Sequence, residues 1–429
     1  MPSPPLREAL SVRFRALRHR NFRLFWTGQL VSLTGTWMQS VAQGWLLHRL
    51  TDSPLMLGLL GFAQFMPVTA LSLWAGVIAD RVDPRRLLLT TQALALLQAA
   101  TLATVTTLGV VEPWMVLALA FAFGALNAFD LPARQSAVVE LVGRDKEDLS
   151  NAIALNSAAF NVARIVGPAI AGVLVALLGE QGCFWANAAT YVAVLAGLWR
   201  VRIAPREHVA GGSTLAALRE GWRYAFGTVP IRNLLVLVAI AAGLGFQYMT
   251  LLPEYARTIL RVDAGRYGLM VSAFGLGALT AALLMTRRLD RWDLRRNLLV
   301  GLVAAGVGQA VFAWSRSLPL TLAMGFVSGF GLILYVASTN TMLQLTTEDR
   351  FRGRIMSLYT FMFVGTAPFG AILAGAVAQR FGAPLATSLC ALILLGSALW
   401  VARRLRFLRE QEAARALATP GPAATEKLG

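Results

Sequence analysis

The stretch ADRVDPRRLLLTTQALALLQAATLATVTTLGV, residues 79–110, places a cluster of charges directly before a long apolar run. From Leu87 to Val110 the run carries no charged residue. A helix rising about 1.5 Å per residue needs about 20 such residues to cross a hydrocarbon core of about 30 Å. The run is continuous and does not alternate with polar residues, which excludes a membrane β-strand. The stretch therefore predicts a membrane-spanning helix that follows a charged loop.

Similar runs recur along the whole chain. Its 429 residues are 56% hydrophobic and 14% charged, whereas soluble domains average about 25% charged residues. We read twelve membrane spans and expect an all-α polytopic membrane protein. The first residues lack a signal-peptide pattern, because the first apolar run is too long for one. The expected spans are 22–48, 54–79, 87–110, 114–133, 150–178, 183–201, 231–252, 265–286, 297–314, 319–341, 354–379 and 383–402.

Basic residues mark one side of the membrane. They gather in alternate loops and in both tails, for example in RFRALRHR (13–20) and RRLRFLR (403–409), and the net charge is +17. The cytoplasmic loops of membrane proteins carry this excess. We therefore expect a multi-pass inner-membrane protein with both termini in the cytoplasm, and we do not expect a nucleic-acid partner. The other side carries few basic residues: Arg49, Arg257, Arg261, Arg266, Arg316 and Arg380.

The sequence repeats itself once. ADRVDPRRLLL (79–89) matches LDRWDLRRNLL (289–299) at an offset of 210, and a second offset of 203 carries Gly172 onto Gly375 and Gly179 onto Gly382. Parallel repeats of this kind predict two pseudo-symmetric six-helix bundles that rock around a shared site. The expected units are the tail 1–21, the bundle 22–201, a central loop 202–230 with an amphipathic helix, the bundle 231–402 and the tail 403–429.

The loop after the second span resembles the signature of the major facilitator superfamily. Its matching residues are Gly76, Asp80, Arg81, Arg85 and Arg86 in GVIADRVDPRR; Asp and Pro replace the common Gly-Arg at 83–84. AFDLPARQS (128–136) and NAIALNSAAFNVARIVGPAIAG (151–172) are similar to the enterobactin-exporter-like branch, also called transmembrane secretion effectors. The resemblance implies the major facilitator fold and a cytoplasmic latch between the halves at this loop. By the repeat, Asp290 and Arg291 supply a second copy.

Two charges lie well inside expected spans, Asp130 and Arg164, and a third, Arg134, lies at the end of the fourth span. An uncompensated arginine in mid-bilayer costs at least about 2.5–3.5 kcal/mol, so Arg164 is expected to face a cavity or a partner. The repeat places Ala337, Thr341 and Ala367 opposite these three residues, so the second half builds the same helices without charge. We predict a role in proton coupling or substrate recognition. A structural ion pair or hydrogen-bond anchor within the first half stays open as the alternative.

Gly167, Pro168 and Gly172 follow Arg164 in the fifth span. Proline removes a helical hydrogen bond, and small residues allow a neighbouring helix to approach closely. The segment resembles the antiporter motif of the superfamily, and the resemblance implies export by exchange. Ordinary small-residue packing is the alternative.

A cavity between the halves is expected to be lined by apolar and aromatic side chains with scattered polar groups, which suits an amphipathic or aromatic solute. Glu254, near the outer mouth, is expected to be solvated, and a role as a gate residue is the alternative. Polar residues on one face of the first span are the first set of expected lining residues: Ser32, Thr36, Gln39 and Gln43. The others are Asn127, Asn161, Gln247, Tyr248, Tyr335, Ser338, Tyr359 and Met362.

The predicted function is proton-coupled export of a siderophore-like compound or a drug. The two lysines, Lys146 and Lys427, do not follow a phosphate-binding glycine loop, so ATP does not drive the transport. We expect no cofactor, no metal site and no enzyme activity, and we expect a monomer that works with protons and the lipid bilayer. Uptake or facilitated diffusion, and a receptor or scaffold that does not transport, are the alternatives.

Overall fold

The computed structural model describes residues 14–143, 145–201, 214–288 and 293–418. After a short 3-10 turn (Arg15–Arg18), the first bundle contains α2 (Arg20–Thr51), α3 (Pro54–Arg81), α4 (Pro84–Thr107), α5 (Pro113–Val142) and α6 (Lys146–Arg200). The second contains the segment 229–259, α10 (Ala264–Arg288), α11 (Leu294–Trp314), α12 (Leu318–Thr346), α13 (Asp349–Phe381) and α14 (Ala383–Ala418). The segment 229–259 begins with α8 (Val229–Ile240) and continues through two π turns, a 3-10 turn and α9 (Leu252–Glu254).

Ten helical stretches in the described ranges are long and apolar enough to cross a membrane. One of them, α6, has 55 residues and makes two crossings, because Gly179 leaves the helical conformation at φ 74° and ψ 179°. The Cys183 thiol lies 3.7 Å from the Ala171 carbonyl oxygen, which shows that the chain doubles back there. With α2, which packs along α6, the described chain has twelve crossing segments. The predicted all-α fold of two six-helix bundles is confirmed.

Asp83 and Pro84 have a local structural role. Pro84 occupies the first turn of α4, and the Asp83 carboxylate accepts the backbone N–H groups of Arg85 (2.7 Å) and Arg86 (3.1 Å). Proline suits this position because its missing N–H would have no helical partner there, and Asp is a favoured N-cap. Asp293 caps α11 in the same way, with 2.9 Å to the N–H of Arg295. Asp83 and Pro84, which depart from the family pattern, therefore form the start of α4.

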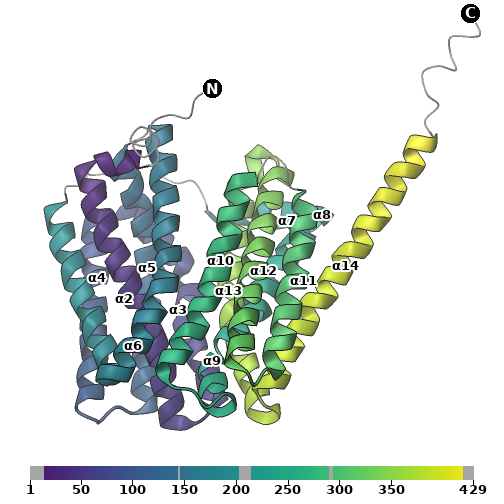
Figure 1. The fold of residues 1–429 in the computed structure, drawn as a ribbon. Helices are drawn as coiled ribbons and strands as arrows, with labels where there is room; N and C mark the ends of the chain where they lie inside the picture. Colours follow the sequence, from purple (N-terminus) through teal and green to yellow (C-terminus); the bar gives the residue numbers. More distant parts are fainter. Residues whose placement is uncertain (1–13, 144, 202–213, 289–292, 419–429) are drawn as a thin grey trace, which may run out of the picture.

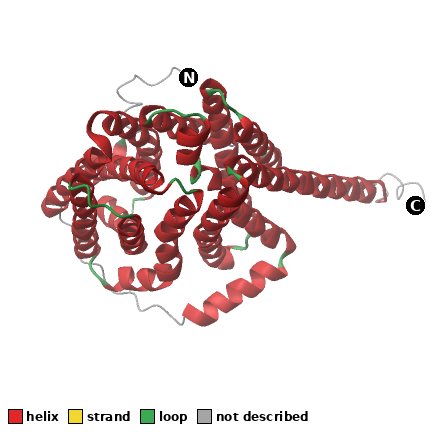
Figure 2. Ribbon diagram, turned by 90° about the horizontal axis from the view of Figure 1, so that it is seen from below, coloured by secondary structure: helices red, strands yellow, loops and turns green. Residues whose placement is uncertain are grey.

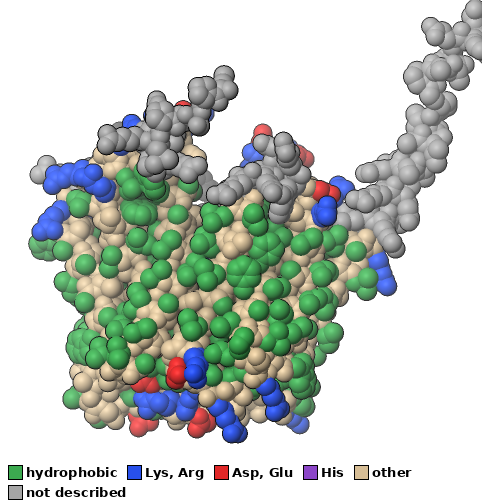
Figure 3. All heavy atoms as spheres, in the orientation of Figure 1, with side chains coloured by type: hydrophobic (Ala, Val, Ile, Leu, Met, Phe, Trp, Pro, Cys, Tyr) green, Lys and Arg blue, Asp and Glu red, His purple; other side chains and the backbone are tan. Residues whose placement is uncertain are grey.

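The two bundles stand side by side, with both chain ends at one face (Figure 1). We call this the termini face and the opposite one the distal face. The view along the helices shows the two groups and the far end of α14 extending beyond them (Figure 2). Apolar side chains cover the middle of the exterior, and charged side chains gather toward the two faces (Figure 3). This distribution fits a bilayer around the middle of the molecule.

The amphipathic helix expected in the central loop is α7 (Thr214–Gly227). It packs against the start of α13, where the Tyr224 and Phe351 rings stack at 4.1 Å. An Arg354 nitrogen donates to the Glu220 carboxylate at 2.7 Å. The helix is therefore held at the termini face by the second bundle.

Candidate functional site

Polar contacts join the two bundles at the distal face. The Ser53 hydroxyl, at the start of α3, donates to the Gln379 side-chain oxygen of α13 at 2.7 Å. The carboxylate of Asp52 and the guanidinium of Arg257 lie 3.4 Å apart. These pairs connect residues about 200 to 330 positions apart in the sequence, and each spans the boundary between the bundles.

Glu254 belongs to the same contact region. Its carboxylate lies 3.1 Å from Nε2 of His48, an imidazole that is fully buried, and the Glu254 side chain is only 13% exposed. The expectation that Glu254 is solvated is wrong. Glu254 is the last residue of α9, which packs against α2.

Small residues make the closest contacts between the bundles. A Cβ added to Gly172 would lie 2.9 Å from Cα of Gly265 in α10, and one added to Gly375 would lie 2.8 Å from Cα of Gly58 in α3. A Cβ added to Gly268 would also lie 3.1 Å from Cα of Gly172. The internal repeat relates this contact to the one between Gly375 and Gly58, because its offsets carry Gly172 onto Gly375 and Gly58 onto Gly268. The motif around Pro168 therefore packs one bundle onto the other.

Gly167 faces the interior of its own bundle. A Cβ there would lie 2.7 Å from Cβ of Trp37 on α2. The predicted kink segment thus contacts α2 on one side and α10 on the other. Small-residue packing, the alternative for this motif, is present at both positions.

The bundles separate toward the termini face. The Thr69 hydroxyl still donates to the Val364 carbonyl at 3.2 Å, and the Ser272 hydroxyl donates to the Ile165 carbonyl at 2.9 Å. Nearer the termini face, a Cβ added to Gly76 or Gly353 would meet nothing within 4 Å. Figure 3 shows a hollow between the bundles at this face. Among the described residues, the bundles are in contact at the distal face and apart at the termini face.

The Asp130 carboxylate forms three polar contacts inside the first bundle. Its carboxylate, in a residue 4% exposed, forms an ion pair with Arg134 one turn later on α5. It also accepts the Thr91 hydroxyl at 2.8 Å and the Gln92 amide at 2.7 Å, both from α4. The structure therefore brings two of the three predicted intramembrane charges together and leaves Arg164 apart from them.

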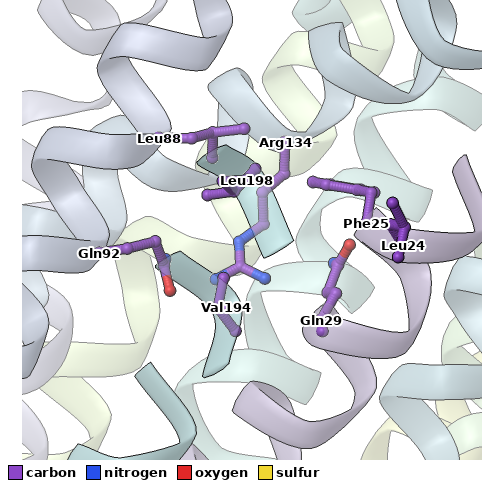
Figure 4. A pocket seen from close by; sticks show the side chains of 9 residues that line it. Leu24, Phe25, Gln29, Leu88, Gln92, Arg134, Val194 and Leu198 are labelled. Atoms are coloured by element: carbon purple, nitrogen blue, oxygen red, sulfur yellow. The ribbon is translucent and has the colours of Figure 1, made fainter. Parts of the chain in front are cut away.

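A small cavity adjoins this ion pair (Figure 4). Arg134 points into it between Gln29 of α2 and Gln92 of α4. The side-chain oxygens of both glutamines are buried without a hydrogen-bond partner among the described residues. Arg134 thus has polar groups on both sides, besides the carboxylate that pairs with it.

Arg164 lies at the junction of the two bundles. The residue is 7% exposed, and one terminal nitrogen donates to the Asn161 side-chain oxygen at 2.9 Å. The guanidinium carbon lies 6.0 Å from the ring centre of Phe160 and 5.7 Å from that of Phe274, which belongs to α10. No described carboxylate lies within 4.0 Å of it. Arg164 therefore does not pair with Asp130, whose partner is Arg134.

Aromatic rings of the second bundle continue from Phe274. Phe246 lies 6.1 Å from Phe274 and 5.9 Å from Phe363, and Tyr359 stacks on Phe363 at 6.2 Å. Tyr248 packs edge-on against Phe274 at 5.9 Å. We call these five residues the aromatic wall. The sequence prediction included Tyr248 and Tyr359 and missed the three phenylalanines, because phenylalanine in an apolar span carries no distinguishing pattern.

The polar face of α2 points into its own bundle. The Gln39 amide donates to the Gln98 oxygen at 3.1 Å and accepts from Asn187 at 2.8 Å. The Gln43 amide donates to a backbone carbonyl of α5 at 3.1 Å. Thr36 meets the Tyr191 hydroxyl at 3.2 Å, and Ser32 is buried. These residues share a face as expected, but their hydrogen bonds lie within the bundle, whereas the prediction placed them on a cavity wall.

Several other predicted lining residues are also engaged internally. Gln247 donates to the Ala242 carbonyl at 2.8 Å, and the buried Tyr335 donates to the Leu237 carbonyl. The Ser338 hydroxyl is fully buried without a partner among the described residues. Half-buried side chains are left as the accessible members of the set: Asn127, Asn161, Tyr359 and Met362.

The latch residues are only partly described. Arg85 donates to the carbonyls of Leu198 (3.1 Å) and Trp199 (2.9 Å) at the end of α6, and Arg81 and Arg86 are exposed. The Asp80 side chain, and Asp290 and Arg291 entirely, lie outside the described part of the structure. Arg85 therefore donates to backbone carbonyls at the end of α6, where basic side chains are favoured.

The sequence of this chain is similar to those of known membrane transporters. A family model described as transmembrane secretion effector matches residues 11–428. The multidrug efflux pump Tap of Mycolicibacterium fortuitum is 28% identical, and the match covers 82% of this chain and 88% of that protein. The staphyloferrin A transporter of Staphylococcus aureus is 25% identical, with 84% and 90% covered.

Solved structures share the fold. The nucleoside transporter NupG superposes with a TM-score of 0.70 at 13% identity, covering 89% of this chain and 98% of that one. A bacterial homologue of the lysosomal transporter Spinster, in an inward-facing and unoccupied conformation, gives 0.70 at 14% identity, with 93% and 97% covered. The chain belongs to the transmembrane secretion effector family of the major facilitator superfamily, and it is a multi-pass membrane transporter of small organic molecules and not an enzyme.

Proposed function

We propose that this transporter exports a siderophore-like compound or a drug across the inner membrane, in exchange for protons. The observation that carries the proposal is the pair of bundles joined at the distal face and separated at the termini face. A transporter working by alternating access must occupy such a state. Relatives named as a multidrug efflux pump and a staphyloferrin A transporter support this substrate range.

The basic loops support an orientation in which the termini face is cytoplasmic. The described state is then open to the cytoplasm, where an exporter loads its substrate. We propose residues 22–201 and 231–402 as the two rocking units, with the tails 1–21 and 403–429 and the loop 202–230 in the cytoplasm. One chain supplies both bundles, so we propose a monomer.

Asp130 is the proton-binding group that we propose. It is a buried carboxylate with an arginine partner, and proton binding would remove the charge that holds Arg134. The small cavity beside Gln29 and Gln92 gives the released guanidinium polar neighbours. Protonation would thus change packing within the first bundle, which is how a proton gradient can bias the movement of the bundles.

The loop after α3 is proposed to latch the bundles when the cytoplasmic side closes. Asp80 would face a helix N-terminus of the other bundle, an interaction of about 0.3–1 kcal/mol near a surface, and Asp290 would act in the second copy. The open surroundings of Gly76 in the described state are consistent with a latch that is released. We expect the variant Asp80→Asn to fold normally but to transport more slowly.

The experiment that tests the proposal uses purified protein in lipid vesicles with an imposed pH gradient. The probes are staphyloferrin A and a panel of dyes and antibiotics. Accumulation of a probe in the acidic compartment, with loss of the gradient and sensitivity to a protonophore, is expected. Equilibration without accumulation would point to facilitated diffusion, and no movement of any probe by folded protein would point to a receptor or scaffold.

Gly172→Val and Gly375→Val are each expected to favour opening of the distal face. In the described state the added side chains would meet backbone atoms of the other bundle, and overpacking of this kind costs about 1–3 kcal/mol. The equilibrium should shift about 5- to 150-fold. A cysteine at Ser272, buried against the Ile165 carbonyl, measures opening by its rate of reaction with a water-soluble maleimide.

Gly396→Val is the matched control, because a Cβ there meets nothing within 4 Å. The natural cysteines, Cys183 and Cys390, are buried and give a low background. Equal labelling in the Gly172, Gly375 and Gly396 variants would show that these contacts do not govern closure.

A further inference from the structure

Arg164 is a buried cation without an anionic partner. It is 7% exposed, and none of the described carboxylates lies within 4.0 Å. Its Nε–H is buried and has no hydrogen-bond acceptor among the described residues. Arg134 in the first bundle, whose side chain is 15% exposed, is by contrast paired with an aspartate. A buried charge is normally paired, so the isolation of Arg164 requires an explanation.

The protein compensates Arg164 only in part. Asn161 accepts one hydrogen bond, and two rings, Phe160 and Phe274, lie within about 6 Å of the guanidinium. Ring faces attract cations but do not accept the in-plane hydrogen bonds that a guanidinium offers. A carboxylate accepts two such bonds side by side from the edge of an arginine. The unpaired Nε–H lies on an edge of this kind.

Arg164 lies where the two bundles meet. The guanidinium lies between α6 of one bundle and Phe274 of the other, at the level where the bundles begin to separate. The aromatic wall continues from Phe274 on the second bundle, and Tyr359 and Phe363 in it are only half-buried. A molecule held here touches both bundles, and it can therefore shift the balance between the two states.

We propose that Arg164 binds a carboxylate of the transported molecule and that the aromatic wall contacts the molecule's apolar part. The substrate class is thus an amphipathic organic acid. This inference rests on the proposed transport function and narrows it, because a cationic compound would be repelled at this position. The second half of the chain has Ala367 at the equivalent place, so the site is single and asymmetric.

The test compares acids with their amides. Purified protein in chloride-free buffer at pH 7.5 is titrated with 1-naphthaleneacetate and with 1-naphthaleneacetamide, and with further acid–amide pairs of aromatic and aliphatic acids. Thermal unfolding reports binding, since a ligand that binds the folded state raises the melting temperature. We expect stabilisation by the acid of at least one pair and about 10- to 100-fold weaker binding of its amide.

Arg164→Gln is expected to abolish the preference for the acid, and Arg164→Lys is expected to retain part of it. Removal of an unpaired buried charge should leave the melting temperature of the ligand-free protein unchanged or higher. Arg316→Gln is the matched control: it removes one exposed positive charge and should keep the preference. The comparison of acid and amide on the unaltered protein does not depend on any variant folding.

Equal binding of acids and amides, no binding of any acid, or a preference that survives in Arg164→Gln would overturn the proposal. Stabilisation by chloride alone to the same extent would also overturn it, since the site would then take an inorganic anion. Gradient-driven transport of neutral or cationic probes that is unaffected by Arg164→Gln would leave the export function standing and reject only the anion site. Absence of all transport, with acid binding intact, would reject the export function and leave the anion site standing.

Discussion

A cross-link between cysteines at Ser53 and Gln379 is expected to stop transport completely and reversibly. The two side chains, from α3 and α13, are 2.7 Å apart across the distal boundary. If the bundles must separate there to release substrate, a covalent bridge holds the protein in the state open to the termini face. Vesicle transport should fall to the level of protein-free vesicles after cross-linking with a short bifunctional thiol reagent and should return after reduction.

Cysteines at Trp314 and Ser388 provide the control. These side chains are 3.0 Å apart and both belong to the second bundle. The same reagent should link them without preventing any movement between the bundles. Transport that continues through the Ser53–Gln379 bridge would mean that the distal boundary does not open during the cycle, and alternating access as described here would be wrong.

Loss of the Asp130 charge is expected to have the largest effect on stability. Asp130→Asn leaves the half-buried Arg134 without its anion, and breaking a pair that is fully buried costs up to about 3–5 kcal/mol. The double variant Asp130→Asn/Arg134→Gln removes both charges, so it should recover at least half of the loss. Unfolding in detergent, followed for both variants, measures the coupling.

The double variant also tests the proton site. If Asp130 carries the coupled proton, the folded double variant should exchange substrate between compartments but should not accumulate it when a pH gradient is imposed. Accumulation that persists would assign Asp130 to structure alone. Asp263→Asn, which removes an exposed pair with Arg266 at 3.8 Å, is the control and should change stability by less than about 0.5 kcal/mol.

Much of the fold was predictable, because membrane spans follow from local composition. The length of each apolar run, the proline and aspartate at the start of α4, and the alignment of Gly179 with Gly382 are all properties of neighbouring residues or of the repeat. Both glycines have positive φ in the structure, 74° and 87°, at the turns that end equivalent helices. Local sequence decides such turns, since few other residues adopt this conformation without strain.

The candidate site was less predictable, because each decisive contact joins residues far apart. In the sequence, Glu254 looks like a solvated acid near the end of a span. Its partner His48 is 206 positions earlier, and the two meet only because the first span of the second bundle packs on α2. Gln39 was correctly placed on a polar helix face. Helical spacing does not say whether that face meets another helix of the bundle or the space between bundles, because both accept polar side chains.

The sequence by itself determined the membrane class, the twelve spans and the duplication, and it placed Asp130 and Arg164 within apolar runs. Those features depend on composition and on a helical rise that is the same everywhere. The tertiary structure alone decided that Asp130 meets Arg134, that Arg164 meets Phe274 and no acid, and which face of the molecule is closed. These outcomes depend on how helices from opposite halves pack, and the free energy of that packing is a sum over contacts that no local segment contains.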